Sequence, residues 1–170
     1  MLDETIITET PPLASCYGRL GQQVRIPMTG HRARRVLHGA LNIRPGAIAL
    51  LITDHWEQDT HHYFLARVRS QWRGGPIVLF EARGAPHPAE ESREVAAALH
   101  IALRLLPVAT PAWHAMDHLW RHVKGCGLAN RATVAIDTSA DMACQYLLAL
   151  SLCERLRKAG VLSGHFWLPL

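Results

Sequence analysis

The chain has 170 residues, of which 49% are hydrophobic and 19% are charged, and its formal net charge is +4. These values fit a single globular domain over 1–170 and exclude a disordered chain. The longest apolar runs, 46–52 and 77–80, are far shorter than the roughly 20 residues of a membrane-spanning helix. The acidic start has no apolar stretch and excludes a secretory signal, so we expect a cytoplasmic protein without a membrane partner.

The first half of the chain predicts antiparallel strands. Residues 2–8 are rich in Ile and Thr and predict a β-strand that Pro11-Pro12 ends. A loop follows, with a short extended piece at 24–27, and then a strand over 34–43 that the turn Arg44-Pro45-Gly46 closes. Residues 47–53 predict a buried strand, so we expect an antiparallel hairpin or meander here.

The second half predicts helices that alternate with strands. A helix is expected over 55–72, ended by Gly74-Gly75. Strand 76–82, helix 90–99 and strand 101–106 have the spacing of a parallel pair with a crossover helix. Apolar residues recur at helical spacing over 116–123, and two more helices are expected at 140–150 and 152–159. The order predicts an α/β fold with a mixed sheet.

Cysteine and arginine usage gives two further expectations. The four cysteines are scattered without a C-x-x-C pair, which predicts reduced, mostly buried thiols rather than disulfides or a zinc site. They are Cys16, Cys126, Cys144 and Cys153. Arginine supplies nearly all the positive charge, because Lys124 and Lys158 are the only lysines. This suits phosphate binding, although a GC-rich genome would favour arginine equally.

Three segments in chain order carry a family resemblance. They are Leu2-Asp3-Glu4-Thr5 with Tyr17-Gly18-Arg19; the apolar run from Ile77 to Glu81 with His87 downstream; and Leu106-Pro107 through Thr110-Pro111 to Met116-Asp117-His118-Leu119-Trp120. Together they resemble the mariner superfamily of DNA transposases, in particular its bacterial insertion-sequence branch. The resemblance covers essentially the whole chain.

The resemblance implies a DDE catalytic domain with a ribonuclease-H-like mixed sheet flanked by helices. Members cut and rejoin DNA with two Mg²⁺ ions (Mn²⁺ substitutes), held by three acidic side chains. It implies that Asp3 and Asp117 are catalytic metal ligands, and that transposon ends and target DNA are partners. It also implies a homodimer and an active-site role for His87, in positioning phosphate or a carboxylate.

The second acid of the expected triad is missing. The family has an Asp five residues before its His, and counting back from His87 gives Ala82. The 34 residues between Ala82 and Asp117 match the characteristic spacing. Glu81 is adjacent, but successive strand residues point to opposite faces unless a bulge intervenes. Three explanations stay open: deliberate replacement of the Asp, natural decay of the copy, or use of Glu81 as the catalytic acid after a local shift.

Two other departures affect the expected site. His114 takes the place of the family's Asn in the loop before the third acid, where it still offers a hydrogen bond or a metal ligand. Only Met1 and Leu2 precede Asp3, so we expect a clipped first strand and no N-terminal helix-turn-helix region. The rival function is therefore a catalytically silent transposase remnant that binds DNA or a partner subunit without cutting.

Basic side chains along the chain are candidates for DNA binding, with structural alternatives. The candidates are Arg34, Arg35, Arg83, Arg121 and Lys124. Arg34 and Arg35 fit a charged strand edge equally well, and Arg121 is placed to pair with Asp117 at i, i+4. His55, His61 and His62 resemble a metal cluster, but a solvated helix start explains them better.

Overall fold

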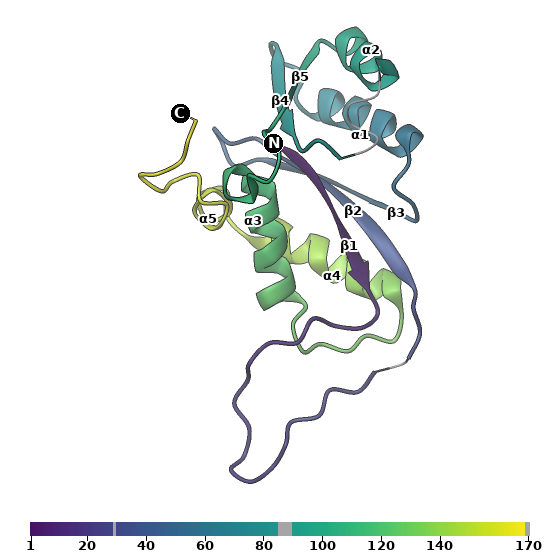
Figure 1. Cartoon of the computed structure of the whole chain (residues 1–170), viewed down its shortest axis with the longest axis vertical. Coiled ribbons are helices and arrows are strands. Elements are labelled where there is room, and N and C mark those ends of the chain that lie inside the picture. The colour runs from purple at the N-terminus through teal and green to yellow at the C-terminus, as the bar shows by residue number, and fades with distance from the viewer. Residues whose placement is uncertain (29, 85–89, 169–170) are drawn as a thin grey trace.

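The computed structural model describes residues 1–28, 30–84 and 90–168. Strands β1 (Leu2–Thr8), β2 (Arg34–Leu41) and β3 (Ile48–Thr53) form an antiparallel sheet in the order β1-β2-β3. β4 (Ile77–Glu81) and β5 (Ile101–Leu105) form a parallel pair, and β4 lies in contact with β1 (Figure 1). The expected mixed α/β arrangement is thus confirmed.

Helices cover the strands on two sides (Figure 1). α1 (Gln58–Gln71) and α2 (Glu90–Ala98) pack on one side, and α3 (Ala115–His122), α4 (Ile136–Ala149) and α5 (Leu152–Lys158) pack on the other. A 3-10 turn (Pro111–Trp113) precedes α3, and a π-helical turn (Val123–Gly127) follows it. None of the helices among the described residues is long and apolar enough to span a membrane.

Alternation along the strands divides the core into two layers. Leu37 and Leu41 of β2 pack with the helices α3 and α4, whereas Ala40 packs with Phe64 of α1. His38 faces the α1 side as well, because its ring centroid lies 5.6 Å from that of Phe64. Each residue of β1, β2 and β4 that belongs to the core therefore packs in one layer, and alternation along the strand decides which.

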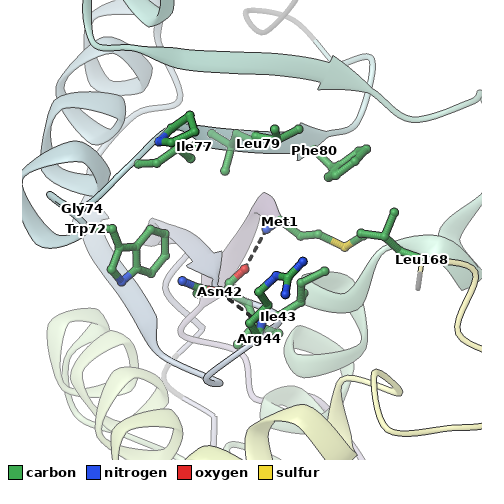
Figure 2. A pocket seen from close by; sticks show the side chains of 13 residues that line it. Met1, Asn42, Ile43, Arg44, Trp72, Gly74, Ile77, Leu79, Phe80 and Leu168 are labelled. Atoms are coloured by element: carbon green, nitrogen blue, oxygen red, sulfur yellow. Dashed lines mark hydrogen bonds between the residues drawn. The ribbon is translucent and has the colours of Figure 1, made fainter. Parts of the chain in front are cut away.

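The β1–β2 ladder is continuous up to the first residue of the chain. The Met1 amino group donates to the Leu41 carbonyl at 2.7 Å, and the Leu41 N–H donates back to the Met1 carbonyl at 2.8 Å (Figure 2). Farther along the two strands, Asp3 lies opposite Gly39, and Thr8 lies opposite Arg34.

Helix α3 approaches the sheet closely because β2 carries a glycine opposite it. A Cβ at Gly39 would lie 2.5 Å from Met116 Cε and 2.6 Å from Trp120 Cζ2. Trp120 itself is 2% exposed and belongs to the core. Because Gly39 is registered with Asp3, this close packing brings the first turn of α3 over the same part of β1.

Several predicted boundaries move in the structure. α1 begins at Gln58 rather than at 55, because the Glu57 N–H donates to Thr60 Oγ1 and caps the helix there. α4 begins at Ile136, four residues before the predicted start, because Ile136 extends the buried stripe of Ala140, Ala143 and Leu147. The extended piece expected at 24–27 forms no strand, and the described part of segment 9–33 is irregular.

The prediction of mostly buried cysteines is wrong, whereas that of free thiols is confirmed. Cys16, Cys126 and Cys153 are exposed and Cys144 is half-buried, and all four are free. The error arose because three of them lie in a loop or on solvent-facing turns, whose surroundings the sequence pattern does not specify.

Candidate active site

Asp3, Ala82 and Asp117 line one pocket, which has a volume of about 540 Å³. Asp3 comes from β1, Ala82 directly follows β4, and Asp117 lies in the first turn of α3. The loop 106–111 completes the lining together with Glu4, Arg83, Gly84 and His114. The three positions expected to form the triad therefore converge, and the one without a carboxylate is Ala82.

Strand parity explains why Asp3 and Ala82 share this pocket. Met1, two residues before Asp3, packs in the layer of α3 and α4, and Phe80, two residues before Ala82, packs in the same layer. Asp3 and Asp117 are both half-buried. The pocket thus opens at the end of β4, on the side of the sheet that α3 covers.

Glu81 lies in the opposite layer, away from Asp3 and Asp117. Its carboxylate is fully buried, and its Oε2 lies 3.8 Å from Nε2 of His61 on α1. The β4–β5 register runs without a bulge through Glu81 and Leu105, so nothing turns Glu81 toward the pocket. The interpretation of His61 as a solvated helix residue is also wrong, because its ring is buried against this carboxylate.

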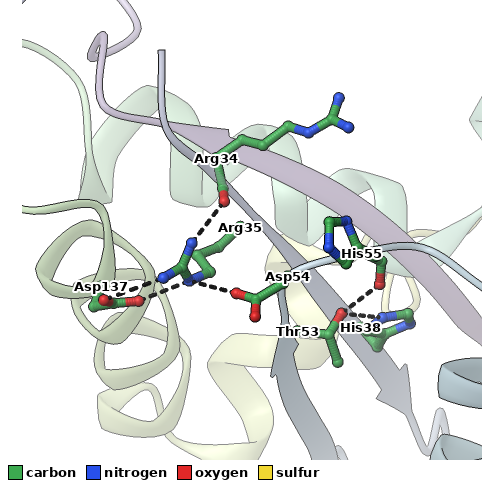
Figure 3. Close-up of polar contacts among 7 residues, drawn as sticks. All are labelled: Arg34, Arg35, His38, Thr53, Asp54, His55 and Asp137. Carbon is green, nitrogen blue, oxygen red and sulfur yellow. Dashed lines mark hydrogen bonds and ion pairs between the residues drawn. The ribbon is translucent and has the colours of Figure 1, made fainter. Parts of the chain in front are cut away.

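A second histidine–carboxylate pair lies in the layer of α1. His38 Nδ1 is 3.5 Å from Glu4 Oε1, and His38 Nε2 is 2.9 Å from Thr53 Oγ1, which donates to the His55 carbonyl (Figure 3). His38 is fully buried. This pair holds β1 against β2 and β3 next to Asp3. The sequence gives no signal for this pair, because only the register of β1 and β2 brings Glu4 opposite His38.

The acidic groups of the pocket suit fewer metal ions than the resemblance implies. Within residues 1–28, 30–84 and 90–168, no three His, Cys, Asp or Glu side chains are grouped closely enough to hold a metal ion. Asp3 and Asp117 offer the hard oxygen donors that Mg²⁺ prefers. Two carboxylates fit one weakly held cation, whereas a two-ion centre needs the carboxylate that Ala82 lacks.

Basic groups accompany the two carboxylates. Arg121 Nη2 lies 3.1 Å from Asp117 Oδ2, which confirms the expected i, i+4 pair. Lys124 is half-buried, and burial lowers its pKa, while the charges of Asp117 and Asp3 act in the opposite direction. Both carboxylates therefore interact with the Lys124 ammonium, one turn beyond Arg121.

His114 is a buried neutral side chain at the wall of the pocket. It is 4% exposed, and burial lowers its pKa from 6.5 to about 4, against the opposing charge of Asp117. His114 is therefore neutral at pH 7 and packs where the loop turns into α3.

This burial predicts a pH-dependent contribution to stability. Because the folded pKa lies below the unfolded value of 6.5, the contribution is complete above pH 6.5 and is lost as the pH falls to about 4. Between pH 7 and 4 we expect His114 to lower the unfolding free energy of the parent by up to about 3 kcal/mol. The His114→Asn variant should lack this decrease. Urea unfolding between pH 7 and 4 measures this. The exposed His165→Asn control should follow the parent, and identical pH profiles for all three proteins would contradict the prediction.

The predicted DNA-binding arginines occupy different places. Arg83 is exposed and lines the pocket. Arg35 is fixed by carboxylates: its Nε lies 2.7 Å from Asp137 Oδ1 and 3.2 Å from Asp54 Oδ1 (Figure 3). Arg34 is exposed at the other end of β2. It is five residues from Gly39, the residue opposite Asp3, which corresponds to roughly 16 Å along the strand. His87 lies outside the described residues.

Comparison with solved structures identifies the fold. The paired-end complex of Mos1 transposase with the left transposon end matches 93% of the chain with a TM-score of 0.70 and 14% identity. The catalytic domain of Mos1 mariner transposase matches 93% of the chain and is itself covered to 73%, with a TM-score of 0.64 and 13% identity. The chain has the fold of a mariner transposase catalytic domain. The ribonuclease-H-like prediction is thereby confirmed.

The likeness to Mos1 concerns the fold, and it covers part of that protein. The chain spans about half the length of the Mos1 chain in the paired-end complex, 50%. A further Mos1 paired-end complex, which contains Mn, matches with a TM-score of 0.72 and 13% identity. No family model matches the sequence, and no curated protein matches it.

Proposed function

We propose that the chain is a DNA transposase catalytic domain of the mariner type, from the bacterial insertion-sequence branch, whose second catalytic acid is lost at Ala82. Its ancestral reaction is metal-dependent cleavage of a DNA strand followed by strand transfer. The observation that carries the proposal is the convergence of Asp3, Ala82 and Asp117 on one pocket of a transposase fold.

In this proposal Asp3 and Asp117 hold a single Mg²⁺ or Mn²⁺ ion. A bound cation of this kind supplies charge that activates an attacking oxygen and stabilises a leaving one. The chain's own groups would do the rest: Arg83 and Lys124 bind phosphate, and the buried His114 fixes the loop from which α3 begins. Glu81 would take no part, because its carboxylate lies against His61 in the other layer.

A second candidate function is a domain that binds DNA or a partner transposase without cutting. Two observations favour it for the chain as it stands: Ala82 at the third corner of the pocket, and the burial of Glu81 away from it. The two candidates share DNA binding and differ in chemistry. An acid at position 82 separates them, because the first candidate predicts that Ala82→Asp gains cleavage and the second predicts that it does not.

DNA binding itself is testable through Arg83, which lines the pocket, and Lys124, whose ammonium interacts with both carboxylates. We expect Arg83→Gln and Lys124→Gln each to weaken binding of a 30-base-pair duplex about equally for all sequences. Each change should reduce the slope of log K against log salt by about 1, the value for one lost phosphate contact. Fluorescence anisotropy across a salt series measures the slope.

The control for this experiment is Arg157→Gln, which removes the same charge from an exposed position on α5. It should leave the slope nearly unchanged. Equal losses for Arg83, Lys124 and Arg157 would mean that binding follows net charge alone, and would remove the pocket from the proposed interface. Arg34, at the far end of β2, would contact an outer phosphate of a longer duplex.

The segment 9–33 supports a homodimer. Figure 1 shows the described part of this segment extending away from the body of the domain, between β1 and β2. It carries apolar side chains in full contact with solvent: Tyr17 and Leu20 are as exposed as in a free peptide, and Leu13 is 72% exposed. Exposed apolar groups of this size mark a contact surface for another protein.

We therefore expect the parent to sediment as a dimer at micromolar concentration and Tyr17→Asp/Leu20→Asp to sediment as a monomer. The double variant should keep the parent's thermal stability, because neither side chain belongs to the core. Leu148→Asp on α4, also exposed and apolar, serves as the matched control and should remain dimeric. A monomeric parent, or a dimer that survives the double change, would remove segment 9–33 from the dimer contact.

A further inference from the structure

A thiol, an imidazole and a phenol meet where α3 passes into the π-helical turn. Cys126 Sγ lies 3.7 Å from Nδ1 of His122, and Nε2 of the same ring lies 2.8 Å from the hydroxyl oxygen of Tyr146. His122 is the last residue of α3, Cys126 belongs to the turn, and Tyr146 comes from α4. We call these three side chains the thiol triad.

The π-helical turn and α4 together fix the geometry of the thiol triad. The main chain of the turn closes where the Leu128 N–H donates to the Val123 carbonyl at 2.9 Å, and turns of this kind recur at functional sites. Gly127 lets α4 approach the turn, because a Cβ there would lie 3.1 Å from Cγ of Tyr146. The phenol ring consequently lies beside the His122 imidazole, with 5.6 Å between the ring centroids.

The protonation of His122 suits a base that accepts the thiol proton. Burial, and then the charge of Lys158, lower the pKa of His122 below its usual value of 6.5, so the ring is neutral at pH 7. A neutral ring carries one proton. When Nε2–H donates to the Tyr146 oxygen, Nδ1 presents its lone pair to the Cys126 thiol. Burial and the charge of Cys126 raise the pKa of Tyr146, so the phenol keeps its own proton.

The thiol of the triad is open to solvent and lies among more positive than negative charge. Cys126 is exposed, whereas His122 and Tyr146 are half-buried. A nucleophile within reach of a base that a third group orients is the arrangement that activates thiols and hydroxyls. Two cations and one anion act on the imidazole and the phenol, and this balance favours a thiolate. They are Lys158, Arg131 and Glu154.

We propose that Cys126 is a site of thiol–disulfide exchange with low-molecular-weight disulfides, with His122 as the base and Tyr146 as the residue that orients it. The Cys126 thiol gives its proton to Nδ1 of His122, and its sulfur attacks one sulfur of the disulfide. A new S–S bond forms to Cys126 as the old one breaks. The leaving thiolate takes the proton from His122, so the products are a mixed disulfide and one free thiol. This inference is independent of the proposed function, since it rests on the thiol triad and not on the carboxylates.

The probe is oxidised glutathione, added to the whole chain at pH 7 and at pH 9. Peptide mass spectrometry follows the mixed disulfide at each cysteine, so the exposed Cys16 is a reference within the same molecule. An unassisted thiol is only a few per cent ionised at pH 7, so we expect Cys126 to react on the order of tenfold faster than Cys16. At pH 9 the ratio of the two rates should fall to about twofold, because both thiols then ionise without a base.

Two variants separate the base from the residue that orients it. His122→Gln removes the proton acceptor and should bring Cys126 down to the rate of Cys16 at pH 7. Tyr146→Phe keeps the imidazole but removes its hydrogen bond, and it should slow Cys126 about threefold, the usual effect of one lost hydrogen bond.

Two further cysteines serve as controls in the same chain. Arg157 Nη2 lies 3.8 Å from Cys153 Sγ, so Cys153 tests a cation without a base and should react nearly as slowly as Cys16. Cys144 is half-buried, and its reaction in a variant would report unfolding of that variant. The ratio of rates in the parent at the two pH values then decides.

Three outcomes would overturn the proposal. Cys126 could react no faster than Cys16 at pH 7. The ratio of their rates could be the same at pH 7 and pH 9, or it could survive His122→Gln in a folded chain. Either of these last two results would mean that exposure alone sets the rate at Cys126.

Discussion

Ala82→Asp is expected to confer magnesium-dependent nicking of supercoiled DNA on a chain that otherwise nicks weakly or not at all. Position 82 lines the pocket with Asp3 and Asp117, and the new carboxylate completes a three-acid donor set. We expect a gain on the order of 10²–10⁴-fold, the usual contribution of one catalytic side chain. Conversion of supercoiled to open-circular plasmid, with Mg²⁺ or EDTA, measures it.

The matched control is Ala82→Asn, which has nearly the same shape but no charge and should remain at the parent's level. Asp3→Asn in the Ala82→Asp background should abolish the gain. If Ala82→Asp folds, keeps its DNA affinity and still fails to nick, the loss of activity involves more than the second acid, and the silent DNA-binding function is favoured. The loop of His114 would then be the next difference to test.

Trp120→Ala is expected to have the largest effect on stability. The indole is buried between α3 and β2, in contact distance of Gly39, at the centre of the larger core cluster. Truncating a buried Trp to Ala costs about 3–5 kcal/mol, which for a chain of this length lowers Tm by roughly 10 °C. Thermal unfolding followed by circular dichroism measures the shift.

Trp120→Phe separates the loss of packing from the loss of the indole N–H. The Nε1 atom of Trp120 is buried and has no hydrogen-bond partner among the described residues. Phe keeps most of the apolar volume and removes this unsatisfied group, so we expect a change within about 1 kcal/mol. A Tm loss for Trp120→Phe as large as that for Trp120→Ala would contradict this account of how α3 is held.

Much of the fold could be predicted from local sequence patterns, because apolar residues recur with a different period in helices and in strands. Residues 48–53 and 77–81 are short apolar runs between turn signals, and both became strands. The ends of helices and strands were mispredicted where the contact that fixes them involves residues far away in the sequence. The early start of α4 depends on burial of Ile136 in a core that the sequence alone does not reveal. The described residues of segment 9–33 pair with no strand, and Pro12 and Ala14 bond to Asn130 instead.

The candidate site was only partly predictable. Chain spacing was sufficient to place Ala82 at the second acid position. Strand alternation made Glu81 a doubtful substitute but left its use after a local shift open, and the structure places its carboxylate against His61 in the other layer. The histidine partners of the buried carboxylates were not predictable, because β-sheet register and the position of α1 decide them. His61 therefore read as a solvated residue although it packs against Glu81. The role of Gly39 was not predictable either, because it consists in leaving room for the Trp120 side chain of α3.

The most direct test of the central claim is a calorimetric titration with Mn²⁺ of the parent, Asp3→Ala and Ala82→Asp. The claim is that Asp3 and Asp117 form a metal site that lacks only the acid at position 82. It predicts weak binding of one ion by the parent, none by Asp3→Ala, and binding at least about tenfold tighter by Ala82→Asp, a gain of about 1.4 kcal/mol or more. A parent that binds no Mn²⁺, together with an Ala82→Asp variant that also binds none, would contradict it.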